Sequence, residues 1–174
     1  MTPLLMVDIC AGLKGTSAAM VARGWEVITL DNDLAFKPDI LCDLRCWNWE
    51  GIKPDLMWFS PPCTEFAREF MPWSRTGKTP DLSIYQACIR IIQEVQPRYW
   101  IIENVKGAIK YFGKPAASIG PFFLWGFFPD LGKIKLSGRK KESLSSSHSA
   151  ERAKIPFELS LAVAQAIEQT ETLL

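Results

Sequence analysis

Residues 4–15 read LLMVDICAGLKG, a continuous apolar run that leads into a turn with two glycines. A run of this kind predicts a buried strand followed by a glycine-rich loop, and residues 16–23 then have a composition compatible with a helix. Gly24 predicts the end of that helix, and residues 25–30 predict a second strand. A strand, a helix and a second strand in this order predict a parallel βαβ unit with a right-handed crossover.

The same alternation continues along the next part of the chain. Short apolar segments at residues 39–43, 55–59 and 99–102 predict three more strands, and apolar residues at a helical spacing predict a helix over residues 82–96. Strands that alternate with helices predict an α/β fold in which helices flank a mostly parallel sheet.

The pattern weakens elsewhere in the chain. Residues 64–81 and 137–150 are rich in polar and turn-forming residues, and we expect both segments to form loops. Residues 122–128 and 133–136 are predicted to pair as an antiparallel hairpin whose aromatic side chains pack in the core. Pro156 predicts the start of a terminal helix.

Length and composition are typical of one soluble domain. The chain has 174 residues, of which 48% are apolar and 22% charged, and no apolar stretch is long enough to span a bilayer. It has five cysteines without a Cys-x-x-Cys pair and a single histidine, which argues against a disulfide framework, a zinc site or a histidine-based triad. We therefore expect a cytoplasmic protein with reduced thiols and no metal, whose chemistry uses Cys, carboxylates, Lys or Arg.

The net charge of +1 conceals a basic block. Residues 106–154 contain ten Lys and Arg against three Asp and Glu, whereas the segments before and after them are net acidic. A local excess of positive charge suits a surface that contacts phosphates, and its alternative is a solvated loop that keeps the protein soluble. The phosphate contacts that we predict within this block are Lys133, Lys135, Arg139, Lys140 and Lys141.

Polar residues stand where the first three predicted strands end. Asp8 precedes the turn at residues 12–15, Asp31 and Asn32 follow the second strand, and Asp43 follows the third. A glycine turn lets a ligand approach the backbone, and an acid after the second strand can accept both hydroxyls of a ribose. The pattern predicts a nucleoside site, with a tight structural turn as the alternative for the glycines.

Two reactive groups follow the next two strands. Cys63 comes after two prolines that fix a rigid turn, which would hold its thiol at the cleft instead of burying it as an apolar filler. Glu103 ends the fifth predicted strand, so its carboxyl would enter the same cleft as a proton donor. The alternative for Glu103 is a cap on a helix that begins near Lys106.

Three segments together resemble the motifs of a known family. Asp8 to Gly15, Ser60 to Cys63 and Glu103 to Val105 resemble, in order and separation, the first, fourth and sixth motifs of DNA cytosine-5 methyltransferases. The resemblance implies a Rossmann-like fold that binds S-adenosylmethionine. It also implies a reaction in which a cysteine attacks C6 of a flipped-out cytosine, a glutamate holds N3 and the exocyclic amine, and C5 accepts the methyl group.

The resemblance also implies roles for particular residues. Cys63 would be the nucleophile and Glu103 the proton-donating clamp on the base. Residues 150–155 are similar to the family's Gln-x-Arg-x-Arg motif, which would place Arg152 near the cysteine and Lys154 near the cytosine O2. The residues implied to bind S-adenosylmethionine are Asp8, Cys10, Gly12, Gly15, Asp31 at the ribose, Asn32, Asp43 near the adenine amine, Leu44 and Pro61.

The sequence departs from the family pattern in several places. Cys10 stands where the family usually has a Phe, Ala150 replaces the Gln of the later motif, and Lys154 replaces its last Arg. Lys offers one point charge where Arg offers a planar fork, which loosens the positioning of a base. The family's target-recognition domain would follow Lys154, but the predicted terminal helix begins there instead.

We therefore expect one catalytic domain over residues 1–174, without a separate target-recognition domain. Within it, residues 1–112 would carry the cofactor and catalytic motifs, residues 113–154 the basic region, and residues 155–174 the terminal helix. The small size is typical of a phage or mobile-element protein.

Three hypotheses about function follow. The first is a minimal DNA cytosine-5 methyltransferase, with sequence recognition absent, very short or supplied by a protein partner. The second is an enzyme that modifies single-stranded DNA or a free cytosine nucleotide. The third is a non-catalytic module that binds the cofactor or DNA and acts through a partner chain. Because Cys63, Glu103 and Arg152 occur together, the catalytic hypotheses are favoured.

Overall fold

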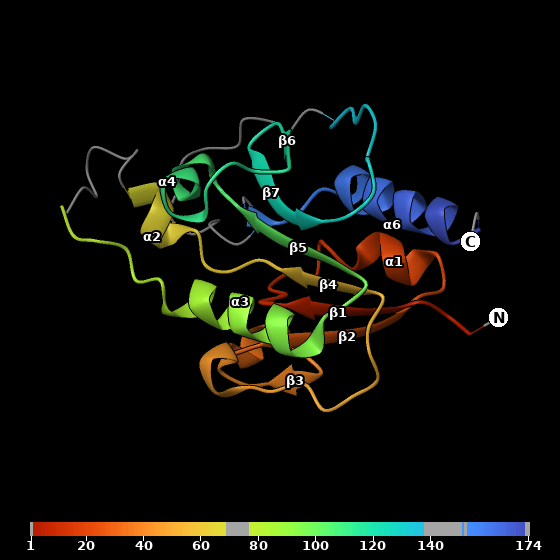
Figure 1. Cartoon of the computed structure of the whole chain (residues 1–174), viewed down its shortest axis with the longest axis horizontal. Helices are drawn as coiled ribbons and strands as arrows, with labels where there is room; N and C mark the ends of the chain where they lie inside the picture. The colour runs from red at the N-terminus through yellow and green to blue at the C-terminus, as the bar shows by residue number, and fades with distance from the viewer. Residues whose placement is uncertain (1, 69–76, 138–150, 152, 173–174) are drawn as a thin grey trace.

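The computed structural model describes residues 2–68, 77–137, 151 and 153–172. Its centre is a seven-stranded sheet with the strand order β3-β2-β1-β4-β5-β7-β6 (Figure 1). The strands are β1 (Leu5–Ile9), β2 (Glu26–Asp31), β3 (Ile40–Leu41), β4 (Leu56–Phe59), β5 (Tyr99–Asn104), β6 (Ala117–Ile119) and β7 (Phe122–Phe127). Strands β1 to β5 pair in parallel, and β7 is antiparallel to both of its neighbours. The prediction of a mostly parallel α/β sheet is confirmed.

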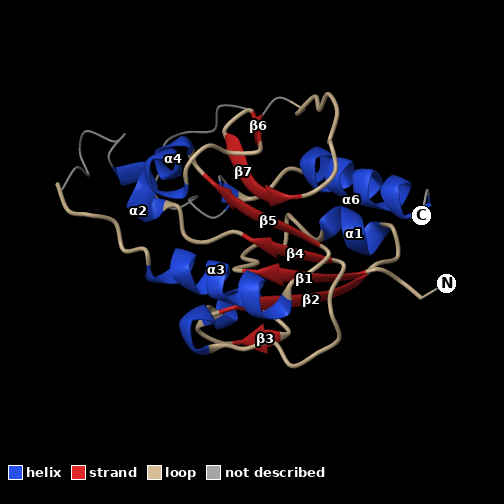
Figure 2. Cartoon of the chain, in the orientation of Figure 1, coloured by secondary structure: helices blue, strands red, loops and turns tan. Residues whose placement is uncertain are grey.

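Helices cover both faces of this sheet (Figure 2). They are α1 (Ala18–Ala22), α2 (Thr64–Ala67), α3 (Ser83–Val95), α4 (Ile109–Phe112) and α6 (Phe157–Thr172), with short 3-10 turns η1 (Leu34–Phe36), η2 (Leu44–Cys46) and η4 (Lys106–Ala108). Residues of α1 and α6 pack in one apolar cluster, and residues of η2, α2 and α3 pack in a second one. The fold is therefore a three-layer arrangement with two cores.

The central strand β4 explains why two cores form. Its side chains alternate, so Leu56 and Trp58 pack toward α1 and α6, whereas Met57 and Phe59 pack toward α3. All four are fully buried. A parallel strand covered on both faces needs apolar residues at every position, which is the continuous run that the sequence contains.

The terminal helix α6 is held against α1 by polar as well as apolar contacts. Ser160 is fully buried, accepts a hydrogen bond from the Ala19 amide at 3.3 Å and donates one to the Thr16 carbonyl. Glu168 accepts the indole N–H of Trp25 at 2.8 Å and pairs with the Arg23 guanidinium. The predicted terminal helix is confirmed, and these bonds fix it over the first crossover.

The structure corrects the prediction that residues 64–81 are entirely loop. Residues 64–67 form α2, and the buried ring of Phe66 in this helix lies 5.7 Å from the Tyr111 ring and 5.0 Å from the Phe112 ring, centroid to centroid. Packing of this aromatic side chain stabilises a turn of helix that the composition of the segment does not favour. Residues 69–76 lie outside the described residues.

The predicted hairpin between residues 122–128 and 133–136 is also wrong. Strand β7 pairs with β5 on one side and β6 on the other. Gly120 adopts a φ of +59° and allows the tight turn that joins β6 to β7. The later apolar residues Leu131, Ile134 and Leu136 instead pack on the core beside α6.

Gly126 in β7 is required by a close approach of two strands. Its φ is +152°, and a Cβ added there would lie 2.0 Å from the Trp100 carbonyl oxygen of β5. We expect Gly126→Ala to lower the free energy of unfolding by about 3–4 kcal/mol, because β5 and β7 must separate. Gly132→Ala is the control, since Gly132 also has a positive φ but no atom lies within 4 Å of the added Cβ.

The control should cost only about 1 kcal/mol of backbone strain. Urea denaturation of the two variants and the wild type measures the difference. Equal losses in both variants would show that close contact with β5 is not what requires the glycine.

Candidate functional site

The strand order reverses between β1 and β4, which makes their carboxyl ends the natural ligand crevice of this sheet. Residues 10–15 follow β1 and residues 60–63 follow β4. The Ser60 amide donates to the Ile9 carbonyl at 2.9 Å, so the two segments separate only after these residues. The segments that carry the sequence motifs thus meet beside the carboxyl ends of the strands.

Asp31 links the end of β2 to the turn after β1. Its carboxylate is buried, with Oδ2 accepting the Gly12 amide at 2.9 Å and Oδ1 accepting the Asp33 amide at 3.0 Å. Each carboxylate oxygen keeps a further lone pair for another donor. No atom lies within 4 Å of a Cβ built on Gly12, so the turn borders open space beside this carboxylate.

Asp8 is a fully buried carboxyl at the end of β1. Its Oδ2 accepts the Thr16 hydroxyl at 2.5 Å and the Ser17 hydroxyl at 2.9 Å, while Oδ1 has no hydrogen-bond partner among the described residues. Burial raises the pKa of Asp8 to about 7, against the opposing effect of the two hydroxyl bonds.

Two other buried polar atoms lie beside Asp8. The indole nitrogen of Trp58 and the hydroxyl of Ser60 also have no hydrogen-bond partner in the described part of the chain. Trp58 is the register partner of Asp8, and Ser60 follows two residues later. Unsatisfied polar groups are costly in a core, so their concentration here marks a place for a polar ligand or water.

Cys10 lies among the acids of the first three strand ends. It is half-buried with a φ of +58°, and burial together with Asp31, Asp8 and Asp43 raises the pKa of its thiol to about 12. Burial and negative charges disfavour the thiolate, which is the nucleophilic form of a cysteine.

Asp43 has a structural partner that the sequence did not reveal. Its Oδ1 accepts the Arg45 amide at 2.9 Å as the cap of η2, and the Arg45 guanidinium pairs with both carboxylate oxygens. Arg45 lowers the pKa of Asp43 to about 2. Leu44, between them, is buried, whereas Asn32 at the end of β2 is exposed.

The turn that carries Cys63 is fastened to the end of β5. Pro61 is buried, and its carbonyl accepts the Asn104 side-chain amide at 2.9 Å. The other side-chain atom of Asn104, Oδ1, accepts the Val105 amide at 2.9 Å. Cys63 is half-buried at the N-cap position of α2. One buried side chain therefore holds two neighbouring strand ends in register.

Glu103 belongs to β5 itself, one residue before Asn104, and is half-buried. In the register of the sheet its preceding residue, Ile102, pairs with Phe59 at the end of β4. Glu103 and Cys63 consequently follow adjacent strand ends. The alternative that Glu103 caps the next helical turn is wrong, because Val105 occupies the N-cap position of η4 without a side-chain cap.

The segment before α6 crosses the turn after β1. A Cβ on Gly15 would lie 2.5 Å from the Ile155 carbonyl oxygen, so only glycine permits this crossing. The Lys154 side chain, which is exposed, also borders Gly15. Gly15 therefore packs on the segment before α6. This packing brings Lys154 to the same side of the sheet as the turn that contains Gly12. Arg152 lies outside the described residues.

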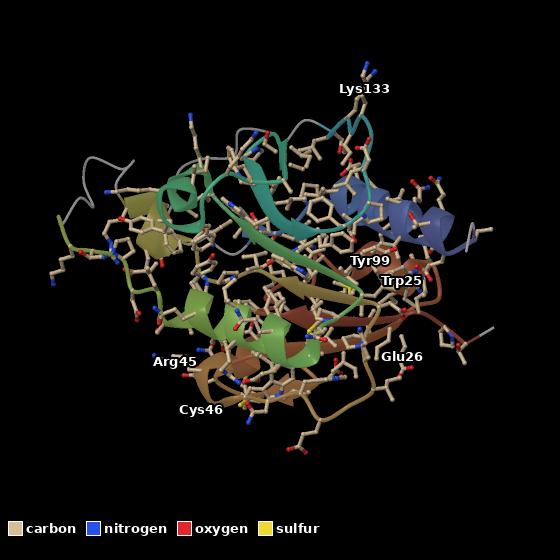
Figure 3. The ribbon with its side chains drawn as sticks, viewed as in Figure 1. Trp25, Glu26, Arg45, Cys46, Tyr99 and Lys133 are labelled. Atoms are coloured by element: carbon tan, nitrogen blue, oxygen red, sulfur yellow. The ribbon has the colours of Figure 1, made fainter. Side chains whose placement is uncertain are left out.

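Two of the predicted DNA contacts, Lys133 and Lys135, lie away from these carboxyl ends of the strands. Phe127 at the end of β7 pairs with Trp100 at the start of β5. The segment after β7 therefore leaves the sheet beside the amino-terminal ends of the parallel strands. Figure 3 accordingly shows Lys133 projecting outward on the side of Tyr99 and Trp25. Lys135 lies in the same segment and is exposed. Arg139, Lys140 and Lys141 lie outside the described residues.

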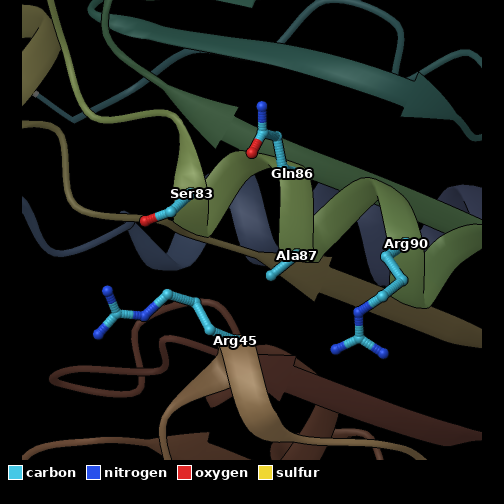
Figure 4. Close-up of a pocket in the computed structure, with 5 residues that line it drawn as sticks. All are labelled: Arg45, Ser83, Gln86, Ala87 and Arg90. Atoms are coloured by element: carbon cyan, nitrogen blue, oxygen red, sulfur yellow. The ribbon is translucent and has the colours of Figure 1, made fainter.

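Two cavities occur away from the strand ends. One of about 390 Å³ separates residues 130–135 from α6. The other, of about 290 Å³, lies between η2 and α3 and is lined by Arg45, Ser83, Gln86, Ala87 and Arg90 (Figure 4). Its arginines are engaged, since Arg45 pairs with Asp43 and Arg90 donates to the Trp47 carbonyl at 2.7 Å. Neither cavity includes a residue that the sequence motifs selected as catalytic.

Metal ligands and membrane-spanning helices are both absent from the described part of the chain. No group of three or more His, Cys, Asp or Glu side chains is arranged there to hold a metal ion. Among the same residues, no helix combines the length and the apolar character needed to cross a membrane.

The three strand-end segments fall within a single family match. The family model of C-5 cytosine-specific DNA methylases matches residues 4–114. The chain belongs to this family. The match covers the segments that begin at Asp8, Ser60 and Glu103, and the methylase sheet described above is therefore that of a Rossmann-like S-adenosylmethionine-dependent methyltransferase.

Solved structures similar to this chain come from several organisms. An Escherichia coli prophage protein described as a DNA modification methyltransferase is 20% identical, with a TM-score of 0.48 over 62% of this chain and 34% of that chain. Dnmt2 of Schizosaccharomyces pombe is 18% identical, with a TM-score of 0.44 over 62% of this chain and 38% of that chain. EhMeth of Entamoeba histolytica is 14% identical, with a TM-score of 0.48 over 82% and 58%. The chain thus spans about a third of the length of the prophage protein. No curated protein matches it.

Sequence reasoning missed several residues that build this site. Thr16 and Ser17 bind the Asp8 carboxyl, and Asn104 fastens the Cys63 turn. Two hydroxyl residues directly after the glycine turn were a usable signal for the first pair. The partner of Asn104 was not readable, because Pro61 lies 43 residues away in the sequence.

The titration of Asp8 provides a test of its buried environment. Because the folded state raises its pKa from 3.8 to about 7, the folded protein retains a proton that the unfolded chain releases. The free energy of unfolding must therefore fall as pH rises from about 4 to 7 and level off above. Asp8→Asn keeps an acceptor for Thr16 but does not titrate, so the wild type should lose up to roughly 4 kcal/mol relative to it.

Denaturant unfolding of wild type, Asp8→Asn and Asp130→Asn at several pH values measures this difference. Asp130 is exposed and serves as the control, whose profile should run parallel to that of the wild type. Parallel profiles for wild type and Asp8→Asn would mean that Asp8 does not retain its proton in the folded state.

Proposed function

We propose that this methylase transfers a methyl group from S-adenosylmethionine to C5 of cytosine in DNA, through a covalent bond to Cys63. The observation that carries the proposal is the hydrogen bond from Asn104 to the Pro61 carbonyl. It fastens the segment of the candidate nucleophile to the segment of the candidate acid at the ligand crevice of the sheet. Family membership supports the same reaction class.

The side chains at the first three strand ends fit the cofactor. The remaining lone pairs of the Asp31 carboxylate can accept two ribose hydroxyls, and the open space beside Gly12 admits the methionine part. The unpaired Oδ1 of Asp8 is an acceptor at the same crevice. Asp43 would meet the adenine amine only while it shares its carboxylate with Arg45. The other residues that we assign to the cofactor site are Cys10, Gly15, Asn32, Leu44 and Pro61.

S-adenosylmethionine supplies an electrophilic methyl group when bound. The Cys63 sulfur attacks C6 of the cytosine with its electron pair and forms an S–C6 bond. Glu103 holds N3 and provides the proton that neutralises the negative charge developing on the ring. The electron pair at C5 would then form the new bond to the methyl carbon while the bond between that carbon and the sulfonium sulfur breaks, with S-adenosylhomocysteine as the leaving group. Loss of the C5 proton to solvent, return of the N3 proton to Glu103 and cleavage of the S–C6 bond restore the ring and return the sulfur electron pair to Cys63.

Two basic residues complete the proposed base pocket. Lys154 borders Gly15 at the same edge of the sheet and can donate to the cytosine O2. Arg152 is assigned the position near Cys63 by the motif alone. Positive charge next to a cysteine favours its thiolate, which is the nucleophilic form.

We further propose that unpaired cytosines are preferred targets. A base must leave the stack to reach a thiol at a strand end, and extraction costs least where the base is already single-stranded or locally melted. Sequence recognition would then come from a protein partner or from elsewhere in a longer chain. DNA is proposed as the substrate in preference to a free nucleotide because of the basic block at residues 106–154.

Removal of the Cys63 thiol tests the covalent step. Cys63→Ala should abolish methyl transfer to single-stranded DNA from labelled S-adenosylmethionine, because the proposed reaction begins with addition of this thiol to C6. Cofactor affinity should stay within about twofold, a change of less than 1 kcal/mol. DNA that contains 5-fluorocytosine should trap the wild type as an adduct resistant to denaturant, since fluorine cannot leave C5 as a proton does.

Cys46→Ala is the matched control, because Cys46 is an exposed thiol on η2 that the proposal does not use. It should retain transfer and adduct formation. Methyl transfer by the Cys63→Ala variant would contradict the mechanism.

Asp31→Asn tests the cofactor site without removing the side chain that holds the turn. The amide keeps one acceptor oxygen but loses the charge and the second acceptor for ribose hydroxyls. We expect the dissociation constant of S-adenosylmethionine to rise at least tenfold, which is about 1.4 kcal/mol. Isothermal titration calorimetry and the thermal shift at saturating cofactor measure it.

Asp33→Asn is the control for Asp31→Asn. Asp33 is exposed and caps η1 through the Ala35 amide, so its loss should leave cofactor affinity unchanged. If wild type and Asp31→Asn bind equally well, the ribose assignment is wrong; absence of binding by the wild type would remove the cofactor proposal itself.

A further inference from the structure

The fold separates the lysines that precede β6 from Lys133 and Lys135, which follow β7. Lys133 and Lys135 follow β7 and lie at the edge of the sheet opposite the Cys63 turn. Lys106 comes two residues after Asn104, beyond Val105, on the side of the sheet where the catalytic segments meet. Basic residues that belong to one block of the sequence therefore lie far apart on the surface.

Three lysines next to the catalytic segments form a lysine ridge, which we define as Lys106, Lys110 and Lys114. All three are exposed. Lys106 begins η4 and Lys110 lies one turn later in α4, so the spacing of four residues along consecutive helical turns puts them on one side. Lys114 follows Gly113, the residue that ends α4.

No acidic residue lies within residues 104–114, the segment that carries this ridge. The sequence has no Asp or Glu between Glu103 and Asp130. Among the described residues, no salt bridge involves any lysine of the ridge. By contrast, Asp130 and Glu158 line the same cavity as Lys133 and Lys135. A ridge with uncompensated positive charge attracts polyanions more strongly than a segment with mixed charges.

The helix that carries the ridge packs against the helix that begins at Cys63. The Phe66 ring of α2 packs on the rings of Tyr111 and Phe112 in α4, at centroid distances of 5.7 and 5.0 Å. Cys63 is the N-cap residue of that same α2. A polymer held by the ridge would therefore keep a fixed position relative to the thiol.

An aromatic face accompanies the charge. Tyr111 is half-buried, and the Lys110 ammonium lies 5.6 Å from the centroid of its ring. Proteins that bind single-stranded nucleic acids combine a basic track along the backbone with aromatic rings on which bases stack. The ridge has both components within one helical turn.

We propose that the lysine ridge holds the phosphates of a single DNA strand beside the target cytosine, and that Lys133 and Lys135 do not contact this strand. The inference rests on the proposed function, because it takes Cys63 as the point where the strand must arrive. It identifies the surface of that site that holds the DNA strand. The lysine ridge takes the place of Lys133 and Lys135, which the sequence analysis had predicted as DNA contacts.

Two double variants with the same change in net charge provide the test. One is Lys106→Gln with Lys110→Gln, and the matched control is Lys133→Gln with Lys135→Gln. Dissociation constants for a fluorescent single-stranded oligonucleotide containing one cytosine are measured by anisotropy at several KCl concentrations. Removing one lysine–phosphate interaction lowers the log–log salt slope by about 0.7 on single strands, so the slope of the ridge variant should be smaller by about 1.4.

The control variant should keep the wild-type slope. Lys106→Arg with Lys110→Arg should also keep it, because the charges remain. A slope that falls equally in the ridge variant and in the control, or only in the control, overturns the inference. Stronger binding of poly-glutamate than of the oligonucleotide by the wild type overturns it as well, because the ridge would then fit an acidic protein. Thermal unfolding checks that each variant is folded.

Methyl transfer measured on the same proteins separates this inference from the proposed function. If the ridge variant has a reduced salt slope but the wild type transfers no methyl group, the strand-holding surface stands and the proposed reaction fails. If the wild type methylates and the ridge variant keeps both slope and rate, the reaction stands and the ridge assignment is wrong.

Discussion

The chain leaves β1 toward one side of the sheet and leaves β4 toward the other, because the strand order reverses between these two strands. No helix can close the space between the two departing segments, and a crevice must form at their carboxyl ends. The residues proposed for catalysis or cofactor binding lie at or after the carboxyl ends of β1 to β5, or in the segment that crosses the turn after β1 before α6 begins. The Asn104 to Pro61 hydrogen bond then fixes the spacing of the two segments on the β4 and β5 side.

This arrangement concentrates buried polar groups that would destabilise an ordinary core. Asp8 is fully buried with a pKa raised to about 7, and its Oδ1 has no partner in the described residues. Trp58, its register partner, also has an unpaired buried donor. Perturbed titration and unsatisfied hydrogen bonds cluster at functional sites, because a ligand supplies what the fold leaves open. The buried polar atoms that lower the stability of the fold are therefore the same atoms that are available to a ligand under the proposed function.

The basic block shows how a sheet redistributes charge. Strand β7 runs antiparallel to β5, so the segment that directly follows β7 leaves the sheet on the side opposite the carboxyl ends of β4 and β5. Lysines 106, 110 and 114 precede β6 and β7, whereas Lys133 and Lys135 follow β7. A net charge counted along the sequence does not distinguish these groups, although only the first one adjoins Cys63.

The sequence determined the layers of this protein and most of its strand-end chemistry. Local apolar runs and glycine turns are properties of neighbouring residues, so the strands at β1, β2, β4 and β5 and the motif residues Asp31, Cys63 and Glu103 could be predicted from them. Contacts between distant residues decided the rest. The pairing of β7 with β6, the helical turn at residues 64–67 and the bond between Asn104 and Pro61 depend on side chains far apart in the chain. The partner of Asp43 and the position of Lys133 also appeared only when the chain was folded, because spatial proximity and strand direction have no counterpart in local sequence pattern.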